Sequence, residues 1–480
     1  MYGVIDVGTT GVKLSVYDSQ GNHVHYEKVV LGFERLQGGL VEQSSQELVR
    51  TVKGLARKAR ELGAKSLGVS VYRASVVAWD RSGRPLTNVI TWIDGRGRSV
   101  VEKLPITAKM LSRLSRPLAY ILSPDSPAVL MKWVYENIPG LYERVKSGDA
   151  FVWTLDSYLL YTSSGKFIAD PSNITLTGLV HPKNFDEIGL VYDILRLPRI
   201  RPELVDNVGD FGSIEGLELK AFIADQQSAA LGLGAVERGR VESVHGTGSF
   251  MELCTGNFVM PPAGLIPVVQ VKVGKTLRYG VEGFLRTSGS VVDWLRDIGF
   301  YSSYEEMEKL AGEGSRRTLI LPSFGGLRVP KAQNAAGMML GLTLGTKRSD
   351  VVAGLAWGVA LYMGYILRMM EQVAGRPEEP LWAAGGFSKS DVFLQFLADA
   401  TGLTVARPAD IEASSRGVLK LLMLADGSSG EEALGHPMPA SAVFAPKLDE
   451  DARKEYMSNF KDIVEALPEW EENIFLRRSW

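Results

Sequence analysis

The sequence predicts an α/β protein built from two similar domains, each with a mixed sheet and helices on its faces. Three observations support this class. The chain of 480 residues is too long for one ordinary hydrophobic core. Residues 4–71 carry strand and helix patterns in the order β-β-β-α-β. A second strand–turn–strand pattern of the same kind returns at residues 244–253, close to the middle of the chain.

The first three strands are apolar runs separated by tight turns. Residues 4–7 and 12–17 flank Gly8-Thr9-Thr10-Gly11, where glycine permits a positive φ and threonine hydroxyls can bond locally. A second turn, Asp18-Ser19-Gln20-Gly21, leads to a third strand near residues 24–31. This local order predicts an antiparallel start to the first sheet.

An amphipathic helix is predicted next, followed by a short strand. Gln43-Ser44-Ser45 supplies the cap, and the helix runs to Leu62. Its apolar face is formed by residues spaced three and four apart: Leu48, Val52, Leu55 and Ala59. Residues 67–71 then form an apolar strand, which makes the sheet mixed and places a helix on one face.

The mid-chain pattern marks the start of the second domain. Val244–Leu253 is again a strand, a Gly246-Thr247-Gly248 turn and a strand. Residues 235–240 are a plausible crossing point, so we expect domains over 1–236 and 237–480. Two similar domains would enclose an interdomain cleft, which is a preferred place for ligands.

Composition excludes several classes of protein. Hydrophobic residues at 45%, charged residues at 22% and a formal net charge of −2 are globular values. The balanced charge gives no broad footprint for nucleic acid or for an anionic membrane, and neither partner is expected. Cys254 is the single cysteine, which excludes an intrachain disulfide and favours a small core residue.

One long uncharged stretch, residues 351–367, is slightly short for a membrane span of about 20 residues. It is interrupted by three glycines: Gly354, Gly358 and Gly364. This pattern favours a buried helix that crosses another element at close range. The N-terminus shows no basic region followed by an apolar region, as a secretory signal would. We therefore expect a soluble, cytoplasmic protein.

The two Gly/Thr hairpins are candidates for phosphate binding. Both Gly8-Thr9-Thr10-Gly11 and Gly246-Thr247-Gly248 can turn backbone N–H groups and a hydroxyl toward phosphate oxygens, and Lys13 could add a charge. Taken singly, each hairpin also reads as an ordinary β-turn. Neither has the spacing of a P-loop, which the sequence lacks.

Two carboxylates are candidates for phosphoryl-transfer chemistry. Asp6 precedes the first hairpin at the end of a strand, where a nucleotide-bound Mg²⁺ would sit, or where a carboxylate would merely cap the turn. Asp225, in Ala224-Asp225-Gln226-Gln227, stands between a strand and a helix N-terminus. The positive helix end favours its carboxylate, which could accept a proton from a bound hydroxyl or act as a simple N-cap.

Two further segments suggest ligand contacts. Thr91-Trp92-Ile93-Asp94-Gly95-Arg96 offers an aromatic face beside hydrogen-bonding groups, which suits a sugar but also describes a core tryptophan with charged neighbours. Trp382–Ser390 reads as a strand, a Gly385-Gly386 turn and a helix, where a flat ligand or a phosphate could approach the backbone.

Four of these segments occur in one order that resembles the FGGY family of carbohydrate kinases. The first hairpin is similar to that family's phosphate-1 motif, and His245–Phe250 to its phosphate-2 motif. Ala224–Ala230 resembles the stretch with the catalytic base, and Ala383–Asp399 the adenosine motif. The likeness runs from Val4 to about Pro408.

The resemblance implies an α/β fold with two ribonuclease-H-like domains of the actin/hexokinase type, ATP and Mg²⁺ as cofactors, and a small sugar or polyol as acceptor. Asp225 would deprotonate the acceptor, and Asp6 with Asp225 would help to hold Mg²⁺. The residues implied to contact the acceptor are Arg73, Trp92, Asp94, Asp225, Gln226 and Phe250. Those implied to contact ATP are Gly8, Thr9, Thr10, Lys13, Gly246, Thr247, Gly248, Gly289, Gly385, Gly386 and Ser390.

Three positions depart from the family pattern. Glycerol kinases grip the polyol with an Arg-Glu pair, where this chain has Arg73-Ala74. Asp125 stands where a tyrosine closes that pocket, and Ala336 where an arginine is common. Losing a carboxylate grip relaxes a preference for glycerol. A ketopentose such as xylulose is therefore the first expectation, and glycerol the second.

Two alternatives use the same fold: an ATP hydrolase or nucleotide switch, and a regulatory sugar sensor. The acceptor residues and the intact Asp6, Thr10 and Asp225 favour a kinase over both. Dimers are common in the family, so the resemblance also allows a homodimer.

Overall fold

The computed structural model describes residues 1–471 as two compact units, and each is described by itself. Unit 1 contains Met1–Gly232, Val268–Arg278 and Ser414–Leu434. Unit 2 contains Leu233–Pro267, Tyr279–Ala413 and the chain from Gly435 onward. The division of the family's domains at residue 236 stays a prediction.

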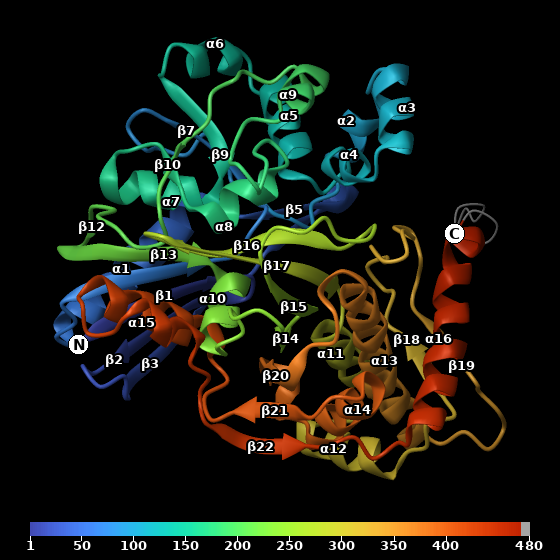
Figure 1. Ribbon diagram of the computed structural model, residues 1–480. Helices are drawn as coiled ribbons and strands as arrows, with labels where there is room; N and C mark the ends of the chain where they lie inside the picture. Colours follow the sequence, from blue (N-terminus) through green and yellow to red (C-terminus); the bar gives the residue numbers. More distant parts are fainter. Residues whose placement is uncertain (472–480) are drawn as a thin grey trace. The chain divides into compact units, whose positions relative to one another are not determined.

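The main sheet of unit 1 is six-stranded, in the order β12-β13-β6-β1-β2-β3 (Figure 1). Its strands are β1 (Tyr2–Gly8), β2 (Gly11–Tyr17), β3 (His23–Val30), β6 (Ser66–Val71), β12 (Ser213–Ile214) and β13 (Leu217–Ala224). The β1, β2 and β3 strands pair antiparallel, whereas β1, β6 and β13 run parallel. The predicted mixed sheet and its first two turns are confirmed.

Helix α1 (Ser45–Glu61) covers this sheet, and its predicted cap is confirmed. The Ser44 hydroxyl accepts a hydrogen bond from the Glu47 backbone N–H at 3.2 Å. All four residues of the predicted apolar face are buried: Leu48, Val52, Leu55 and Ala59.

The predicted order β-β-β-α-β is incomplete, because β4 (Glu34–Leu36) and β5 (Leu40–Gln43) come before α1. These strands join a separate five-stranded sheet, β4-β5-β8-β7-β9, with β7 (Val76–Asp80), β8 (Val89–Ile90) and β9 (Ala150–Thr154). They lack a local signal because β4 is short and fully exposed, and glycines follow it.

The remaining elements of unit 1 lie between β8 and the end of α10. They are α2 (Arg98–Glu102), α3 (Ile106–Leu114), α4 (Arg116–Ile121), α5 (Pro127–Asn137), α6 (Leu141–Lys146), α7 (Leu155–Ser164), β10 (Ile168–Ala169), α8 (Pro171–Ile174), α9 (Gly189–Leu195), β11 (Glu203–Leu204) and α10 (Asp225–Gly232). α10 follows β13 directly, so it starts at the carboxyl end of a central parallel strand.

A seven-stranded sheet, in the order β16-β17-β15-β14-β20-β21-β22, belongs mostly to unit 2, and its residues 268–278 are assigned to unit 1. Its strands are β14 (Arg240–His245), β15 (Ser249–Gly256), β16 (Ile266–Val273), β17 (Thr276–Leu285), β20 (Glu378–Ala384), β21 (Val405–Pro408) and β22 (Ala440–Phe444). β14, β15 and β17 are antiparallel, and β14, β20 and β21 are parallel. The order and directions of β17-β15-β14-β20-β21 repeat those of β3-β2-β1-β6-β13 in unit 1. The predicted duplication is therefore confirmed.

Helix α13 (Arg348–Ala374) forms the centre of unit 2. A Cβ atom on Gly358 would lie 1.9 Å from the Ile320 carbonyl oxygen, and one on Gly354 would lie 2.7 Å from that of Thr318. The predicted close crossing is therefore confirmed. By length and composition α13 could span a membrane, but 94% of its most apolar window is buried within the fold, as in a core helix.

The other elements of unit 2 surround α13. They are α11 (Gly289–Asp297), α12 (Tyr304–Glu313), β18 (Leu319–Leu321), β19 (Met338–Leu340), α14 (Asp391–Thr401) and α16 (Glu450–Trp470). Helix α16 ends at Trp470, and residues 472–480 lie outside the described part of the chain. Cys254 is buried within β15, as predicted.

Helix α15 (Ala413–Ala425) packs within unit 1, although the sequence-based division assigned it to the second domain. The missing side chain of Gly68 on β6 makes room for Val418, whose Cγ1 would lie 2.3 Å from a Cβ there. Gly417 likewise approaches α10 so closely that its Cβ would lie 1.8 Å from the Ser228 carbonyl oxygen. Close packing of this kind fixes the position of α10.

Candidate active site

One edge of the unit 1 sheet gathers the predicted catalytic segments. Val7 of β1 is the register partner of Val71 on β6, and Val71 is in turn the partner of Ala224 on β13. The three strands are parallel, so their carboxyl ends meet at the same edge. The first hairpin, Tyr72-Arg73 and Asp225 therefore lie side by side.

Asp6 is buried on β1, with a polar partner on each side. The Ser70 hydroxyl donates to its Oδ1 at 2.7 Å, and Lys13 Nζ lies 3.5 Å from its Oδ2. Asp6 and Lys13 are direct cross-strand partners, so the β-hairpin itself sets this ion pair. Lys28, opposite Lys13 on β3, donates to Thr10 Oγ1 at 3.3 Å. Charged side chains thus surround the first hairpin.

The donor set at this edge fits a nucleotide-bound Mg²⁺. Such an ion uses one or two carboxylates and takes its other oxygen ligands from phosphate and water. Asp6 and Asp225 supply two carboxylates at one edge of the sheet. Within residues 1–471, no three or more Asp, Glu, His or Cys side chains are grouped so that they could hold a metal ion.

Asp225 begins α10, and its neighbours hold it in place. Arg73 Nε lies 3.8 Å from Asp225 Oδ1, which also accepts the Gln226 backbone N–H at 2.8 Å. The Asp225 carbonyl oxygen accepts the Ser414 hydroxyl of α15 at 3.0 Å. The Asp225 side chain is 31% exposed and that of Arg73 is 10% exposed. The carboxylate is therefore oriented yet open to a small molecule.

Further hydrogen bonds are made by Tyr72 and Arg73, next to the Arg73–Asp225 pair. The Tyr72 hydroxyl donates to Gln43 Oε1 at 2.7 Å, and Arg73 Nη1 donates to Gln227 Oε1 at 3.5 Å. Burial raises the pKa of Tyr72 well above its ordinary value, and the negative charge of Asp225 raises it further. Tyr72 therefore stays a neutral hydrogen-bond donor.

Ser75 links Arg73 to Trp92. Its hydroxyl accepts the Trp92 backbone N–H at 3.0 Å and donates to the Arg73 carbonyl oxygen at 3.3 Å. Between them, Ala74 adopts a left-handed conformation with φ of 58°. Trp92 is half-buried against the core of unit 1. The structure thus places Arg73, Trp92, Asp225 and Gln226 in one unit, and their contact with an acceptor stays a prediction.

Asp94 is engaged within the protein. Its carboxylate accepts Arg96 Nε at 2.8 Å and the Val41 backbone N–H at 2.6 Å, and the residue is only 2% exposed. Arg96 also donates to Glu42 at 2.7 Å and lies over the Trp133 ring. This geometry lets Asp94 hold the loop of Trp92 in place; direct contact with an acceptor stays a prediction.

In unit 2, the second hairpin is braced by neutral hydrogen bonds. His245 Nδ1 is 2.8 Å from the Ser249 hydroxyl, which donates to the Ser288 hydroxyl at 2.9 Å. The His245 ring packs edge-on against Phe393, with 4.7 Å between centroids. Burial lowers the pKa of His245 to about 3, so the ring is neutral.

Glycines allow three segments to converge at the second hairpin. A Cβ on Gly289 would lie 2.3 Å from the Gly246 carbonyl oxygen, and one on Gly385 would lie 2.6 Å from that of His245. By contrast, a Cβ on Gly246 or Gly386 would meet nothing within 4 Å. These two backbone segments are therefore open to a ligand while their neighbours are tightly packed.

The remaining predicted residues of unit 2 lie nearby in the chain. Ser390 caps α14 by accepting the Phe393 backbone N–H at 3.0 Å, and it donates to Glu308. The Phe250 ring stacks on Phe284 with 5.2 Å between centroids. The turn before α14 is thus rigid, and Phe250 presents an aromatic surface.

Sequence reasoning missed the serines that hold both hairpins in place. Ser70 had a usable signal, because it is the one polar residue in the apolar run Leu67–Val71. Ser249 and Ser288 carry no such signal, since their contact joins residues from separate segments. The contact of Ser414 also has no local sequence signal, because Ser414 is distant from α10 along the chain.

Comparisons with known proteins agree with this arrangement. The profile of the FGGY family of carbohydrate kinases, N-terminal domain, matches residues 1–206, and that of its C-terminal domain matches residues 241–425. A glycerol kinase from Coxiella burnetii is 31% identical over 486 residues, covering 96% of both chains.

Two solved structures share the fold. The Plasmodium falciparum glycerol kinase with ADP has a TM-score of 0.85 at 24% identity, covering 97% of this chain and 98% of its own. A ligand-bound xylulose kinase from Lactobacillus acidophilus has a TM-score of 0.80 at 17% identity, covering 99% and 98%. The chain belongs to the FGGY family of carbohydrate kinases, and it is an ATP-dependent phosphotransferase with an alcohol group as acceptor.

Proposed function

We propose that this kinase moves the γ-phosphoryl group of ATP onto a hydroxyl of a sugar or polyol, with Asp225 as the general base. The observation that carries the proposal is the Arg73–Asp225 pair at the sheet edge, where Arg73 Nε lies 3.8 Å from Asp225 Oδ1. A base must be oriented and reachable, and both conditions hold for a carboxylate that is 31% exposed.

In this proposal, Asp225 accepts the proton of the acceptor hydroxyl as its oxygen attacks the γ-phosphorus. The bond between the γ-phosphorus and the β–γ bridging oxygen breaks, and ADP leaves. Most of the catalysis is positioning and charge stabilisation, since the reaction requires little covalent chemistry from the protein. Arg73 and Gln226 orient the acceptor, while the two hairpins and the Gly385-Gly386 turn bind ATP. Asp6 and Asp225 would hold Mg²⁺, which would supply charge neutralisation for the phosphates.

The acceptor that this site favours is a ketopentose such as xylulose. Ala74 places a methyl group next to Arg73, where a glutamate would supply a second grip on a small polyol. A shorter side chain leaves room for a longer substrate. Glycerol is the second candidate, because the Coxiella burnetii relative, 31% identical over 96% of the chain, is a glycerol kinase.

A coupled assay of ADP formation tests the acceptor. Xylulose, ribulose, glycerol and gluconate are compared at equal concentration, with a reaction that lacks any acceptor as control. We expect the highest kcat/KM with a ketopentose. A kcat/KM for glycerol ten times higher than for every ketose would overturn the substrate, whereas ATP turnover that ignores every acceptor would overturn the kinase itself.

The variant Asp225→Asn tests the base. Because it keeps the shape of the side chain, we expect loss of phosphoryl transfer with nucleotide affinity nearly unchanged. Asp94→Asn serves as a contrast, since Asp94 is buried against Arg96. If Asp225→Asn retained more than a tenth of the wild-type kcat, Asp225 would not be the base.

We also propose a cytoplasmic location without membrane or nucleic-acid partners, and a homodimer as an assembly state. The balanced net charge of −2 supports the first part. Light scattering coupled to size-exclusion chromatography measures the assembly state, and a single peak at the monomer mass would exclude the dimer.

A further inference from the structure

A small cavity lies in unit 1 between α1, α7 and the β6, β12 and β13 strands, on segments that the proposed chemistry does not use. Its volume is about 130 Å³. A cavity of roughly 150 Å³ is enough to hold benzene. The size therefore matches one six-membered ring or a short branched chain, which is too small for a nucleotide.

Six of the ten residues that line the cavity are apolar. Apolar side chains from five elements contribute to this surface: Val49, Val52, Val69, Leu159, Ile214 and Phe222. Val52, Val69, Leu159 and Phe222 are each no more than 3% exposed. A ligand body in contact with this surface would be apolar, because a polar group there would lose its hydration without gaining a partner.

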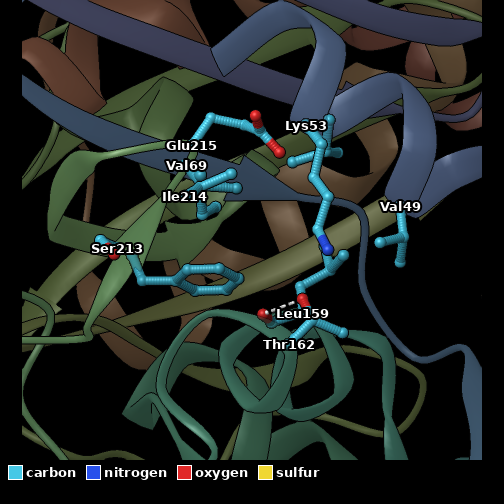
Figure 2. Close-up of a pocket in the computed structure, with 10 residues that line it drawn as sticks. Val49, Lys53, Val69, Leu159, Thr162, Ser213, Ile214 and Glu215 are labelled. Atoms are coloured by element: carbon cyan, nitrogen blue, oxygen red, sulfur yellow. Dashed lines mark hydrogen bonds between the residues drawn. The ribbon is translucent and has the colours of Figure 1, made fainter. Parts of the chain in front are cut away.

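The polar part of the lining has one unpaired cation. Figure 2 shows Lys53 extending along the cavity with its nitrogen on the Thr162 side. Neither the Lys53 ammonium nor the Ser213 hydroxyl makes a hydrogen bond or ion pair within residues 1–471. Glu215, the one acidic residue of the lining, is paired with Arg57, whose Nη2 lies 3.0 Å from its Oε2. The net charge offered to a ligand is therefore positive.

We propose that this cavity binds a small monocarboxylate with an apolar body of benzene size. The body fills the space between Val49, Val69 and Phe222, and the carboxylate meets the Lys53 ammonium and the Ser213 hydroxyl. A cationic ligand at this place would be repelled by the Lys53 ammonium, and a neutral analogue would lack the ion pair with it. Affinity should thus follow the order carboxylate, neutral, cation.

The probe is 4-fluorobenzoate, titrated into the full-length protein and followed by the line width of its ¹⁹F NMR signal. We expect saturable binding with a Kd of roughly 0.1 to a few millimolar, given the few heavy atoms of the ligand. The neutral 4-fluorobenzamide should bind several-fold more weakly, and 4-fluorobenzylamine should not bind.

Variants of the lining locate the binding. Lys53→Gln should weaken 4-fluorobenzoate at least fivefold and leave 4-fluorobenzamide unchanged, whereas Lys58→Gln on the same helix is a matched control without effect. Val49→Phe, from α1, and Thr162→Leu, from α7, should each fill the cavity and weaken both ligands. These positions lie outside the catalytic groups, so kinase activity without ligand reports that each variant is folded.

The proposal fails if 4-fluorobenzoate does not bind at 10 times the upper expected Kd. It also fails if folded Val49→Phe and Thr162→Leu both bind it as the wild type does, or if the benzylamine binds as tightly as the benzoate. Binding should persist in Asp225→Asn, which separates this cavity from the acceptor site.

Discussion

The two hairpins have the same strand–turn–strand design, but their surroundings differ in charge. In unit 1, Asp6, Lys13 and Lys28 surround the Gly8–Gly11 turn and form an ion pair and a charged hydrogen bond. In unit 2, the Gly246–Gly248 turn is braced by His245 and two serine hydroxyls, all of them neutral.

This difference indicates a division of labour between repeated halves. A charged turn can respond to the charges of a metal and of phosphate oxygens, whereas a neutral, closely packed turn can only offer its backbone in a fixed shape. Gly289 and Gly385 supply that shape by letting two more segments touch the second hairpin. Duplication gives both halves the same turn, and the neighbouring side chains then give each turn its own charge.

The largest expected effect comes from removing charge at the first hairpin. Asp6→Asn should lower kcat on the order of 100-fold or more, because a carboxylate beside the phosphates would be lost while its shape is kept. Steady-state kinetics at saturating ATP and Mg²⁺ measure the change. Asp18→Asn, in the next turn along the chain, between β2 and β3, should leave kcat within twofold. A fall of less than tenfold for Asp6→Asn would contradict the charged role of this hairpin.

Changing the shape of the second hairpin should weaken ATP binding in two distinguishable ways. Gly289→Ala forces a methyl group to 2.3 Å from the Gly246 carbonyl oxygen, so we expect lower stability by about 1–3 kcal/mol together with lower affinity. Gly246→Ala meets nothing within 4 Å, so it should lower affinity alone.

Thermal unfolding and calorimetric titration of a non-hydrolysable ATP analogue measure both quantities. If Gly246→Ala bound the analogue with wild-type affinity, the second hairpin would not be a phosphate contact. A wild-type unfolding temperature for Gly289→Ala would show that the close approach is not rigid.

The neutral brace of the second hairpin predicts acid sensitivity. Burial lowers the pKa of His245 in the folded protein to about 3, whereas its ordinary pKa is about 6.5. Between these two pH values the unfolded chain therefore binds one more proton than the folded chain. Its stabilising contribution is full above pH 6.5 and is lost as the pH falls toward 3, by up to about 1.4 kcal/mol per pH unit. In denaturant titrations between pH 7.5 and 5, His245→Asn should flatten this decline. An unchanged slope would contradict the prediction.

The buried acid of unit 1 should give a pH effect of the opposite sign. Burial, and then the charge of Asp170, raise the pKa of Asp156 to about 8. Its contribution to stability is full below pH 4 and is lost as the pH rises through 8. Asp156→Asn keeps the neutral shape and should reduce the loss of stability between pH 6 and 9, measured by denaturant midpoints. A steeper alkaline loss in this variant would refute the assignment.

Local patterns predicted what depends on neighbouring residues. The first two turns, the Ser44 cap and the buried face of α1 follow from spacing within a few residues. The spacing of Gly354 and Gly358 also indicated the close crossing of α13. The order of motifs supplied the other candidate site residues through the family resemblance, and their roles stay predictions.

The missed features depend on pairing between distant segments. The Ser70 hydroxyl reaches Asp6 only because β1 and β6 are parallel neighbours. β4 and β5 gain their stability from a separate sheet rather than from their own pattern. The Asp94 carboxylate looked available from its sequence, yet the fold engages it with Arg96 and the Val41 backbone.

The return of α15 to unit 1 affects how the protein can be made. A ribosome must synthesise more than 400 residues before Ser414 can hold α10 or Val418 can pack on Gly68. Until then, the nascent N-terminal half exposes an apolar surface that chaperones could bind. A gene cut at residue 236 would leave the same surface uncovered, so a fragment that contains all of unit 1 requires residues 268–278 and 414–434 to be supplied by fusion or by a second chain.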